Sequence, residues 1–306
     1  MTTTTPKPRR LRRFLLRCML ICFAVLLLLV GLFFLDGLVL ASRQKVVLLP
    51  ATTSTAIPPT DVITIAAMNI AKGFAPITDT RYDTPERVRQ RLDDMAAVLI
   101  AEKPDIVVLS EVMTECTPCP VDQLQHIRDA LAMPHAAFGE NYHFGLPFMH
   151  VVGGNAILGK VPLKPEANFD LIGRKWFYQT SNSRRALFAS IELNGSTVLI
   201  GSLHNDSYDT RNNTKQVEQL LEFIGDRPCI LAGDFNAMPK QAPIQLIQAS
   251  GNFVGEFDGP PTFPAEKPVK RIDYILAPKA WTHLETRVLD GEASDHRAVV
   301  ARFRIR

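Results

Sequence analysis

Apolar residues in this chain form two kinds of pattern. Between Cys18 and Leu35 every residue is apolar or glycine, so this stretch has no polar face. Beyond residue 60, short apolar runs of strand length alternate with segments whose apolar residues recur every three or four positions. The first pattern predicts one long apolar helix, and the second predicts a domain of buried strands and amphipathic helices.

Eight runs have the length and composition of strands. Leu187 to Leu193 and Thr197 to His204 flank Asn194-Gly195, which is a strong signal for a tight hairpin. In the last run, apolar residues alternate with Arg302 and Arg304, as expected for a half-buried strand. The predicted strands cover residues 61–70, 105–109, 155–158, 187–193, 197–204, 229–232, 271–276 and 299–305.

Three segments have helical periodicity. Thr84-Pro85 predicts a helix start, because proline is favoured at the first helical position, and Pro104 ends that segment. Two further helices are predicted at residues 121–131 and around residues 217–224. Strands outnumber helices and the hairpin indicates antiparallel pairing, so the elements fit an α+β sandwich, with sheets packed together and helices outside.

The N-terminal region is predicted to cross a membrane. The first 13 residues carry five basic residues and no acid, and the apolar stretch after them is long enough to span a bilayer. The positive-inside rule places the N-terminus in the cytoplasm and everything after Leu40 outside. The alternative is secretion after cleavage of a signal peptide near Ala41, because Val39-Leu40-Ala41 resembles a cleavage site.

These features divide the chain into four regions. A stretch rich in Thr, Ser, Ala and Pro follows the apolar helix and reads as a linker, and no further boundary is visible after it. The regions are a basic cytoplasmic flank (1–13), a transmembrane anchor (14–40), a linker (41–60) and a folded domain (61–306).

The overall charge of +3 comes from the N-terminus. Residues 1–43 hold seven of the 34 Lys and Arg residues and one of the 31 acidic residues, which leaves a net charge of −3 for the remainder. By charge count, the domain is therefore not a basic nucleic-acid-binding module. A local basic patch at Arg184-Arg185 stays possible.

Three of the five cysteines lie outside the apolar helix. Cys229 sits in an apolar run and is expected to be inert packing. Cys116 and Cys119 form a lone C-x-x-C, whereas a zinc site needs a second pair. Since the domain is predicted to lie outside the cytoplasm, we expect a short disulfide between them, with a redox dithiol as the alternative.

Polar residues follow many of the predicted strands. Gly233 breaks the apolar run 229–232, and Asp234 and Asn236 come directly after it, where the sheet can hold a water and an oxyanion in place. Other polar residues in the same situation are Asn69, Glu111, Asn155, His204, Asp295 and His296. Side chains gathered at strand ends can converge on one rim, so we expect a catalytic site there.

At this point the chain resembles the endonuclease/exonuclease/phosphatase superfamily, the proteins that look like deoxyribonuclease I. Eight stretches match in the family's order and cover about residues 62–304. They are Met68-Asn69-Ile70, Leu109-Ser-Glu-Val112, Gly154-Asn-Ala-Ile-Leu158, Ser202-Leu-His204, Gly233-Asp-Phe-Asn236, Pro261-Thr-Phe263, Arg271-Ile-Asp-Tyr274 and Ser294-Asp-His296. The resemblance implies a four-layer α/β/β/α sandwich with a divalent ion, Mg²⁺ or Mn²⁺, at the rim.

The resemblance also implies a role for each polar residue. Glu111 is the expected principal metal ligand, with Asn69 and Asp295, because carboxylate and amide oxygens suit hard Mg²⁺. Asp234 would position or deprotonate the attacking water, and Asn236 would bond a phosphate oxygen. The other expected roles are orientation and charging of His296 by Asp273, contact with the scissile phosphate by His204, and phosphate binding by Asn155, Arg184 and Arg185.

These residues point to a membrane-anchored, metal-dependent phosphoesterase that hydrolyses phosphomonoesters or phosphodiesters of small or lipid substrates. The first alternative is an extracytoplasmic nuclease acting on DNA or RNA. The second is a catalytically idle binding or scaffold protein with the same fold. A phosphoester substrate and the membrane are the expected partners, nucleic acid is possible, and the sequence indicates no protein partner.

Overall fold

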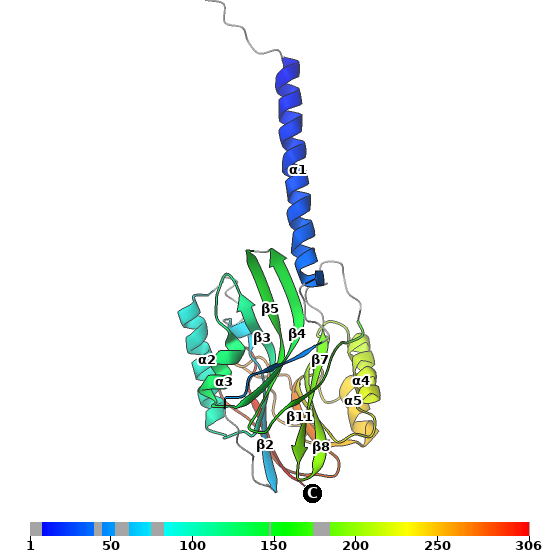
Figure 1. The fold of residues 1–306 in the computed structure, drawn as a ribbon. Helices are drawn as coiled ribbons and strands as arrows, with labels where there is room; N and C mark the ends of the chain where they lie inside the picture. The colour runs from blue at the N-terminus through cyan, green and yellow to red at the C-terminus, as the bar shows by residue number, and fades with distance from the viewer. Residues whose placement is uncertain are drawn as a thin grey trace, which may run out of the picture.

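The computed structural model describes residues 8–39, 45–52, 61–74, 83–146, 148–173 and 184–305. The first seven residues, the possible cleavage site at Ala41 and much of the predicted linker lie outside the described residues. The described parts form a long N-terminal helix and a sandwich of two sheets with helices on both outer faces (Figure 1).

The first sheet has seven strands in the order β1-β4-β5-β3-β2-β13-β12. In this sheet β2 and β3 are parallel, and the other neighbouring pairs are antiparallel. Its strands are β1 (Val46–Leu49), β2 (Val62–Asn69), β3 (Ile106–Cys116), β4 (His135–Leu146), β5 (Met149–Gly159), β12 (Thr282–Val288) and β13 (Val299–Arg304).

The second sheet has six strands in the order β10-β11-β9-β8-β7-β6. Here β8 and β9 are parallel, and the other pairs are antiparallel. The strands are β6 (Lys164–Asp170), β7 (Arg185–Leu193), β8 (Ser196–His204), β9 (Cys229–Asp234), β10 (Phe253–Gly255) and β11 (Asp273–Pro278). The Asn194-Gly195 hairpin joins β7 to β8 as predicted.

Helices cover the outer face of each sheet. α2 (Pro85–Ile100) and α3 (Gln123–Ala130) pack on the first sheet, and α4 (Thr210–Ile224) and α5 (Ala242–Ser250) pack on the second (Figure 1). α2 starts as predicted, because the Thr84 side chain accepts a hydrogen bond from the Arg87 backbone N–H. A third apolar cluster fills the space between the sheets. The predicted sandwich, with sheets inside and helices outside, is confirmed.

Several elements were not predicted. β1 lies within the segment predicted as a linker and pairs with β4 at the edge of the first sheet. β3 was predicted to end at Leu109 but continues to Cys116. β4, β6, β10, β12 and α5 also escaped prediction, because most of these segments are short or carry polar residues and glycine among their apolar ones.

The disulfide predicted between Cys116 and Cys119 is not formed. Both cysteines are free and buried, and they pack in the apolar cluster beneath α2 and α3. Burial raises the pKa of both thiols, so they behave as core residues rather than as a reactive pair. The prediction was wrong because it rested on the inferred compartment alone. Cys229 is a free, buried cysteine, as expected.

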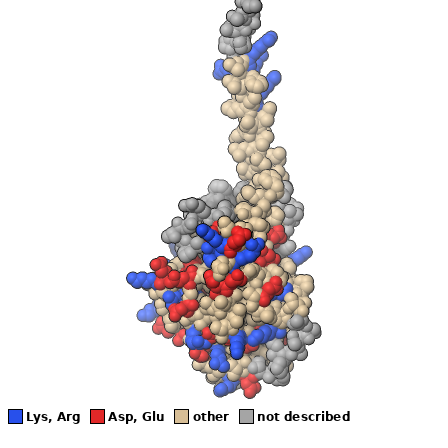
Figure 2. Space-filling view, turned by 90° about the vertical axis from the view of Figure 1, so that its left-hand side faces the viewer, with Lys and Arg blue, Asp and Glu red and all other residues tan. Residues whose placement is uncertain are grey.

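The N-terminal helix α1 (Pro8–Val39) extends away from the sandwich. Its segment Arg10–Phe33 is long and apolar enough to cross a membrane and is not buried against the domain. Lys and Arg gather at its far end, an uncharged stretch follows, and the visible face of the domain carries mixed charges (Figure 2). A membrane anchor and a signal peptide share these features.

Candidate active site

Parallel pairing brings several polar strand ends to one rim of the sandwich. In the first sheet, β2 ends at Asn69, directly opposite Ser110 of β3. In the second sheet, His204 at the end of β8 is in register with Asp234 at the end of β9, which is in register with Asp273 at the start of β11. The structure therefore gathers residues from both sheets, as the pattern of strand ends predicts.

Gly233 allows this close pairing of β8 and β9. Its φ is +129°, and a Cβ atom placed on it would lie 2.3 Å from the backbone oxygen of Leu203. A larger residue would both strain the backbone and push the strands apart. Glycine at this position therefore lets Asp234 sit next to His204.

Glu111 reaches the rim through an irregularity in β3. Pairing with β5 shifts register between Leu109 and Val112, and Glu111 has a left-handed φ of 58°. Such a bulge turns a side chain out of the normal alternation of a strand. Glu111 thus lies within β3 rather than just beyond its end as the sequence suggested.

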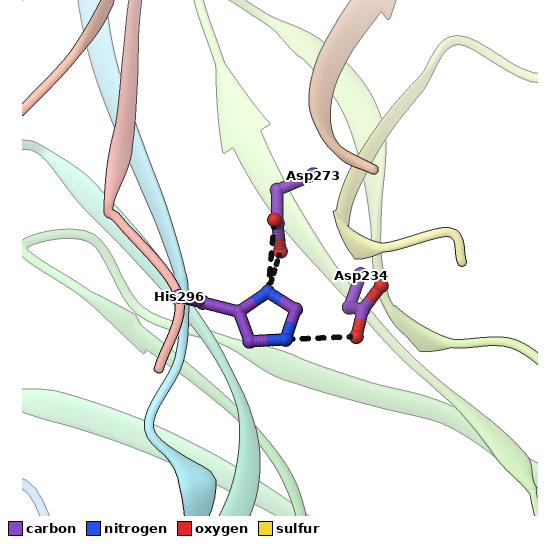
Figure 3. Close-up of side chains that lie close together, drawn as sticks. All are labelled: Asp234, Asp273 and His296. Carbon is purple, nitrogen blue, oxygen red and sulfur yellow. Dashed lines mark hydrogen bonds and ion pairs between the residues drawn. The ribbon is translucent and has the colours of Figure 1, made fainter. Parts of the chain in front are cut away.

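His296 is held between two aspartates (Figure 3). Its Nδ1 lies 2.9 Å from Oδ2 of Asp273, and its Nε2 lies 3.7 Å from Oδ2 of Asp234. Thr262 donates its hydroxyl to the same Asp273 oxygen at 2.5 Å, which fixes that carboxylate from the other side. The predicted pairing of Asp273 with His296 is thus present, and Thr262 is a further member that sequence reasoning did not assign.

The two aspartates decide the charge of His296. Burial alone would lower the pKa of His296, but the Asp273 and Asp234 carboxylates outweigh it and raise this pKa to about 10. Burial raises the pKa of Asp234, and the nearby negative charge of Asp273 adds to that effect. His296 is therefore an imidazolium at neutral pH, placed against a carboxylate that accepts a proton more readily than an exposed aspartate.

Asn236 is fixed close to Asp234. Its backbone N–H donates to Oδ1 of Asp234 at 2.9 Å, and its side-chain amide donates to the backbone oxygen of Asn205 at 3.1 Å. Asn236 has φ of 48°, a conformation that asparagine tolerates better than most residues. The loop after β9 therefore keeps Asp234 and Asn236 in one fixed arrangement.

His204 and Arg184 form another part of the cavity wall, where Nε2 of His204 lies 3.5 Å from Asp234 and 3.6 Å from Glu111. The Arg184 guanidinium lies 2.8 Å from Nδ1 of His204 and donates to Oγ of Ser207 at 3.2 Å. Burial lowers the pKa of His204 to about 4, and the charge of Arg184 acts in the same direction. His204 is thus a neutral imidazole at neutral pH, while Arg184 supplies the positive charge.

Lys72 is a site residue that the sequence analysis did not single out. It lies in the short helix η1 (Ala71–Gly73) with a left-handed φ of 59°, and its Nζ lies 2.7 Å from Oε2 of Glu111. Burial would raise the pKa of Glu111, but His204, Lys72 and Arg184 together hold it well below its usual range. The position of Lys72, three residues after Asn69 at a strand end, was the available signal.

These residues enclose one small polar cavity of about 210 Å³. A larger hollow of about 480 Å³ lies around Trp281 and the Asn194-Gly195 turn and contains none of the predicted site residues. The small cavity is lined by Asn69, Lys72, Glu111, Asn141, Tyr142, Arg184, His204, Ser207, Tyr208, Asp234, Asn236 and His296. We take it as the candidate active site.

Two predicted phosphate-binding residues do not line this cavity. Asn155 is fully buried and donates to the backbone oxygens of Arg185 and Ser202, so it ties the two sheets together. Arg185 is 1% exposed and pairs with Asp170 at 2.8 Å. Adjacent positions on an extended segment face opposite sides, so Arg184 lines the cavity and Arg185 does not, whereas Asn155 lies behind the cavity and accepts a hydrogen bond from Asn141 of its lining.

The predicted metal ligands and the tightest ligand cluster differ. Among the described residues, Asp234, Asp273 and His296 are the group whose possible ligand atoms all lie within 4.8 Å of one another. The side-chain amide of Asn69 donates to Glu111 and Asp234 rather than turning its oxygen toward them. Burial raises the pKa of Asp295, and the charges of Glu111 and Asp234 raise it further, so three carboxylates share this region.

Comparisons with known proteins agree with this geometry. The model of the Endonuclease/Exonuclease/phosphatase family matches residues 66–296, whereas no curated protein matches the chain. A similar solved structure is an endonuclease/exonuclease/phosphatase from Beutenbergia cavernae, with 23% identity and a TM-score of 0.65 over 80% of this chain and 72% of that chain.

Two further solved structures carry more specific descriptions. A mannosyl-6-phosphatase from Bacteroides thetaiotaomicron has 17% identity and a TM-score of 0.58, over 79% of this chain and 100% of that chain. The human Nocturnin catalytic domain, with a bound sulfate anion, has 18% identity and a TM-score of 0.58, over 85% of this chain and 96% of that one. At these identities the likeness shows the fold alone.

Proposed function

Because the chain belongs to the endonuclease/exonuclease/phosphatase family of hydrolases, we propose that it is a membrane-anchored, divalent-metal-dependent phosphoesterase acting on small or lipid phosphoesters. The observation that carries this proposal is the chain of contacts from Asp273 through His296 to Asp234, beside Asn236 and Glu111 in one cavity. This arrangement holds a base (Asp234), a cation (His296) and a carboxylate for a metal ion (Glu111) in fixed positions.

The donor set fits a hard divalent cation. The negative charges of Glu111, Asp234 and Asp295 gather in one region, where a bound cation would relieve their mutual repulsion. Glu111 and Asp295 would hold this ion, with Mg²⁺ or Mn²⁺ as the preferred choice for carboxylate oxygens. When bound, the ion would neutralise charge on the phosphate oxygens and supply Lewis-acid chemistry.

We assign the Asp234, Asp273 and His296 cluster to proton handling rather than to the metal. Nδ1 of His296 lies 2.9 Å from Asp273 and Nε2 lies 3.7 Å from Asp234, so both ring nitrogens face carboxylates, as the two N–H groups of an imidazolium require. Its raised pKa, about 10, favours the imidazolium, which has no lone pair to give. The cluster is thus better suited to hold a proton and a positive charge.

Each residue of the cavity has a separate role in the proposed hydrolysis. Asp234 orients the attacking water and takes its proton, because its carboxylate is buried and has a raised pKa. His296 stabilises negative charge on the phosphoryl group, and Asn236 donates its amide to a phosphate oxygen. Lys72 and Arg184 add positive charge on the other walls of the cavity. All these groups are in place before substrate binds, so little reorganisation is needed.

The membrane anchor is the second part of the proposal. α1 has a basic end, and an uninterrupted apolar run of bilayer length follows it (Figure 2). Basic residues before a span favour a cytoplasmic N-terminus, which places the domain outside the cytoplasm. A reporter enzyme that is active only outside the cytoplasm, fused after Arg306, should be active. Activity of only a cytoplasmic reporter at that position would contradict the orientation.

Small phosphoesters fit the cavity better than a long polyanion. The cavity is lined by Lys72, Arg184 and His296, which can meet a single phosphoryl group, and residues 44–306 carry a negative net charge. The similar mannosyl-6-phosphatase is described as acting on a sugar phosphate, which is a small phosphomonoester. A sulfate anion in the Nocturnin domain is compatible with a tetrahedral oxyanion site in this fold.

The direct test is metal-dependent turnover by the full chain in detergent. We expect hydrolysis of bis-p-nitrophenyl phosphate or p-nitrophenyl phosphate that is lost with EDTA and restored by Mg²⁺ or Mn²⁺. A Glu111→Gln variant should need more metal for half-maximal rate, whereas Lys279→Gln, an exposed position at the larger hollow around Trp281, serves as the control. Undiminished turnover in EDTA would contradict the metal dependence. No turnover of any phosphoester would favour an idle binding protein.

A further inference from the structure

Three strands of the first sheet continue beyond the active site. β2 stops at Asn69, but β3 runs on to Cys116 and pairs there with Val151 of β5. β4 and β5 continue together until Leu146 pairs with Met149. The β4–β5 hairpin therefore projects from the same end of the sandwich that carries the catalytic rim, and Tyr142 of β4 lines the cavity at its base (Figure 1).

Two residues at the turn of this hairpin are apolar and exposed. Phe148 is 71% exposed and Met149 is 43% exposed, and no charged residue lies between Leu146 and Met149. Tight turns on a soluble surface usually carry polar residues and glycine, because water then satisfies the backbone. An exposed aromatic next to an exposed Met at the tip of a long hairpin indicates an apolar environment for the turn.

α1 runs beside this hairpin, so the position of α1 in a bilayer would determine how close the hairpin turn comes to the lipids. The end of α1 near the domain packs against β4, and α1 rises past the turn (Figure 1). Leu32 and Phe33 are half-buried there, whereas nearly all other described side chains of the apolar run are exposed. The apolar run continues to Leu35, so the part of α1 that meets the domain still belongs to the segment of membrane-spanning composition.

We propose that the β4–β5 turn inserts into the outer leaflet, with Phe148 and Met149 as a second membrane contact beside α1. This inference rests on the proposed function, because it requires that α1 stays attached and spans the bilayer. The occupant of the exposed apolar surface is thus the lipid layer. The contact adds a second point, beside α1, that holds the orientation of the domain relative to the bilayer.

Ionisable groups of the hairpin stay behind the turn, as insertion requires. His150 lies 2.6 Å from Glu115, and His143 lies 3.6 Å from Glu140. Each of these carboxylates thus has a histidine beside it at the level where headgroups and water are present. Apolar residues therefore enter the hydrocarbon edge while paired charges remain outside it.

The length of the hairpin also determines how far the cavity lies from the membrane. From Tyr142 to Leu146 an antiparallel strand advances about 14 Å. A headgroup layer of about 5–8 Å per leaflet covers roughly half of that distance. The catalytic rim then lies just above the headgroups, which suits a phosphoester that is carried by a lipid and projects from the membrane surface.

Fluorescence quenching tests the insertion without any substrate. The full chain would be placed in phosphatidylcholine–phosphatidylglycerol nanodiscs with acyl chains that are unmodified or brominated near the headgroup. A Phe148→Trp variant should lose most of its added emission in brominated discs. Leu284→Trp is the matched control, because Leu284 is 40% exposed on β12 at the opposite end of the sandwich. The emission of the wild-type protein, which contains Trp176 and Trp281, is subtracted from the emission of each variant.

Equal quenching of the Phe148→Trp and Leu284→Trp variants would overturn the insertion, and so would a mature protein whose N-terminus lies near Ala41. A second measurement supports it through function. A Phe148→Ser/Met149→Ser variant should keep the wild-type rate on soluble bis-p-nitrophenyl phosphate but hydrolyse phosphoester lipids in nanodiscs several-fold more slowly. Failure of the unaltered protein to hydrolyse any lipid counts against the proposed substrate, whereas absence of quenching counts against the insertion.

Discussion

At the scale of single residues, Asp234 is the side chain on which the chemistry most depends. Asp234→Ala removes the group that takes the proton from water, so turnover of a phosphoester should fall by about 10²–10⁴-fold. The substitution leaves the Asn236 N–H and the Asn69 amide without this acceptor, so some loss of stability is expected and the fold must be checked beside the rate. Steady-state kinetics and near-UV circular dichroism would measure both effects. Retention of most activity would show that Asp234 is not the base.

Asp273 acts through His296, and the pH profile can separate this role from a merely structural one. His296 keeps its proton up to about pH 10, mainly because of Asp273 and Asp234. Asp273→Asn removes one of these charges, so the pKa of His296 should fall. The limb where kcat/KM declines at high pH should move to lower pH by about 1–3 units. The asparagine retains an oxygen that can accept the Thr262 and His296 hydrogen bonds.

A lower kcat with an unchanged alkaline limb would contradict this account. Thr262→Val is the useful comparison, because it removes a hydrogen bond to Asp273 without removing its charge. It should shift the limb less than Asp273→Asn does.

The sequence predicted the residues at the centre of the cavity better than the residues that line its walls. Asp234, Asp273, His296 and Asn236 follow from short motifs, because each lies at or next to a strand end. Lys72 and Tyr142 were missed, since a lysine after a strand and a tyrosine within one are common without any function. Asn155 and Arg185 do not line the cavity, which the sequence could not show because a motif does not reveal which sheet face a side chain occupies.

At the scale of elements, the alignment of β8 with β9 depends on Gly233. Gly233→Ala places a Cβ atom 2.3 Å from the Leu203 backbone oxygen, which cannot move without breaking the pairing. We expect a loss of at least about 2 kcal/mol in the free energy of unfolding, from strain and overpacking. Activity should fall as well, because His204 and Asp234 lose their register.

The Asn194-Gly195 turn offers a matched control for this substitution. Gly195 has φ of +81°, but no atom lies within 4 Å of an added Cβ. Gly195→Ala should therefore cost only about 1–2 kcal/mol of backbone strain and leave kcat unchanged. Urea unfolding and kinetics of both variants would decide the matter. Equal effects on activity would show that close strand contact at Gly233 is not what aligns the site.

Strongly apolar elements were predictable, and edge elements were not. β2, β8, β9 and β11 are almost fully buried, so their sequences are nearly continuous apolar runs. β12 and β1 lie at opposite edges of the first sheet, where one side meets solvent and the apolar signal weakens. The bulge at Glu111 depends on pairing with β5, which is a tertiary effect that no local pattern contains.

At the scale of the whole molecule, charge distribution separates a phosphoesterase for small or lipid substrates from a nuclease. Residues 44–306 carry a net charge of −3, and Glu111, Asp234, Asp273 and Asp295 place part of this negative charge at the rim. Binding of a nucleic acid draws on several Lys and Arg contacts with phosphates, so its affinity falls steeply with salt. Here the cavity offers Lys72 and Arg184.

The full chain in nanodiscs should therefore hydrolyse small or lipid phosphoesters faster than it nicks plasmid DNA. Its kcat/KM on a small phosphoester should change less than about tenfold between 50 and 200 mM salt, whereas a protein that makes six or more phosphate contacts loses about 10³–10⁵ in affinity over that range. Parallel assays on bis-p-nitrophenyl phosphate, phosphoester lipids and supercoiled plasmid would measure this. Efficient nicking at physiological salt, without turnover of small or lipid phosphoesters, would favour the nuclease instead. That outcome would require a basic surface that binds the duplex despite the negative net charge of the domain.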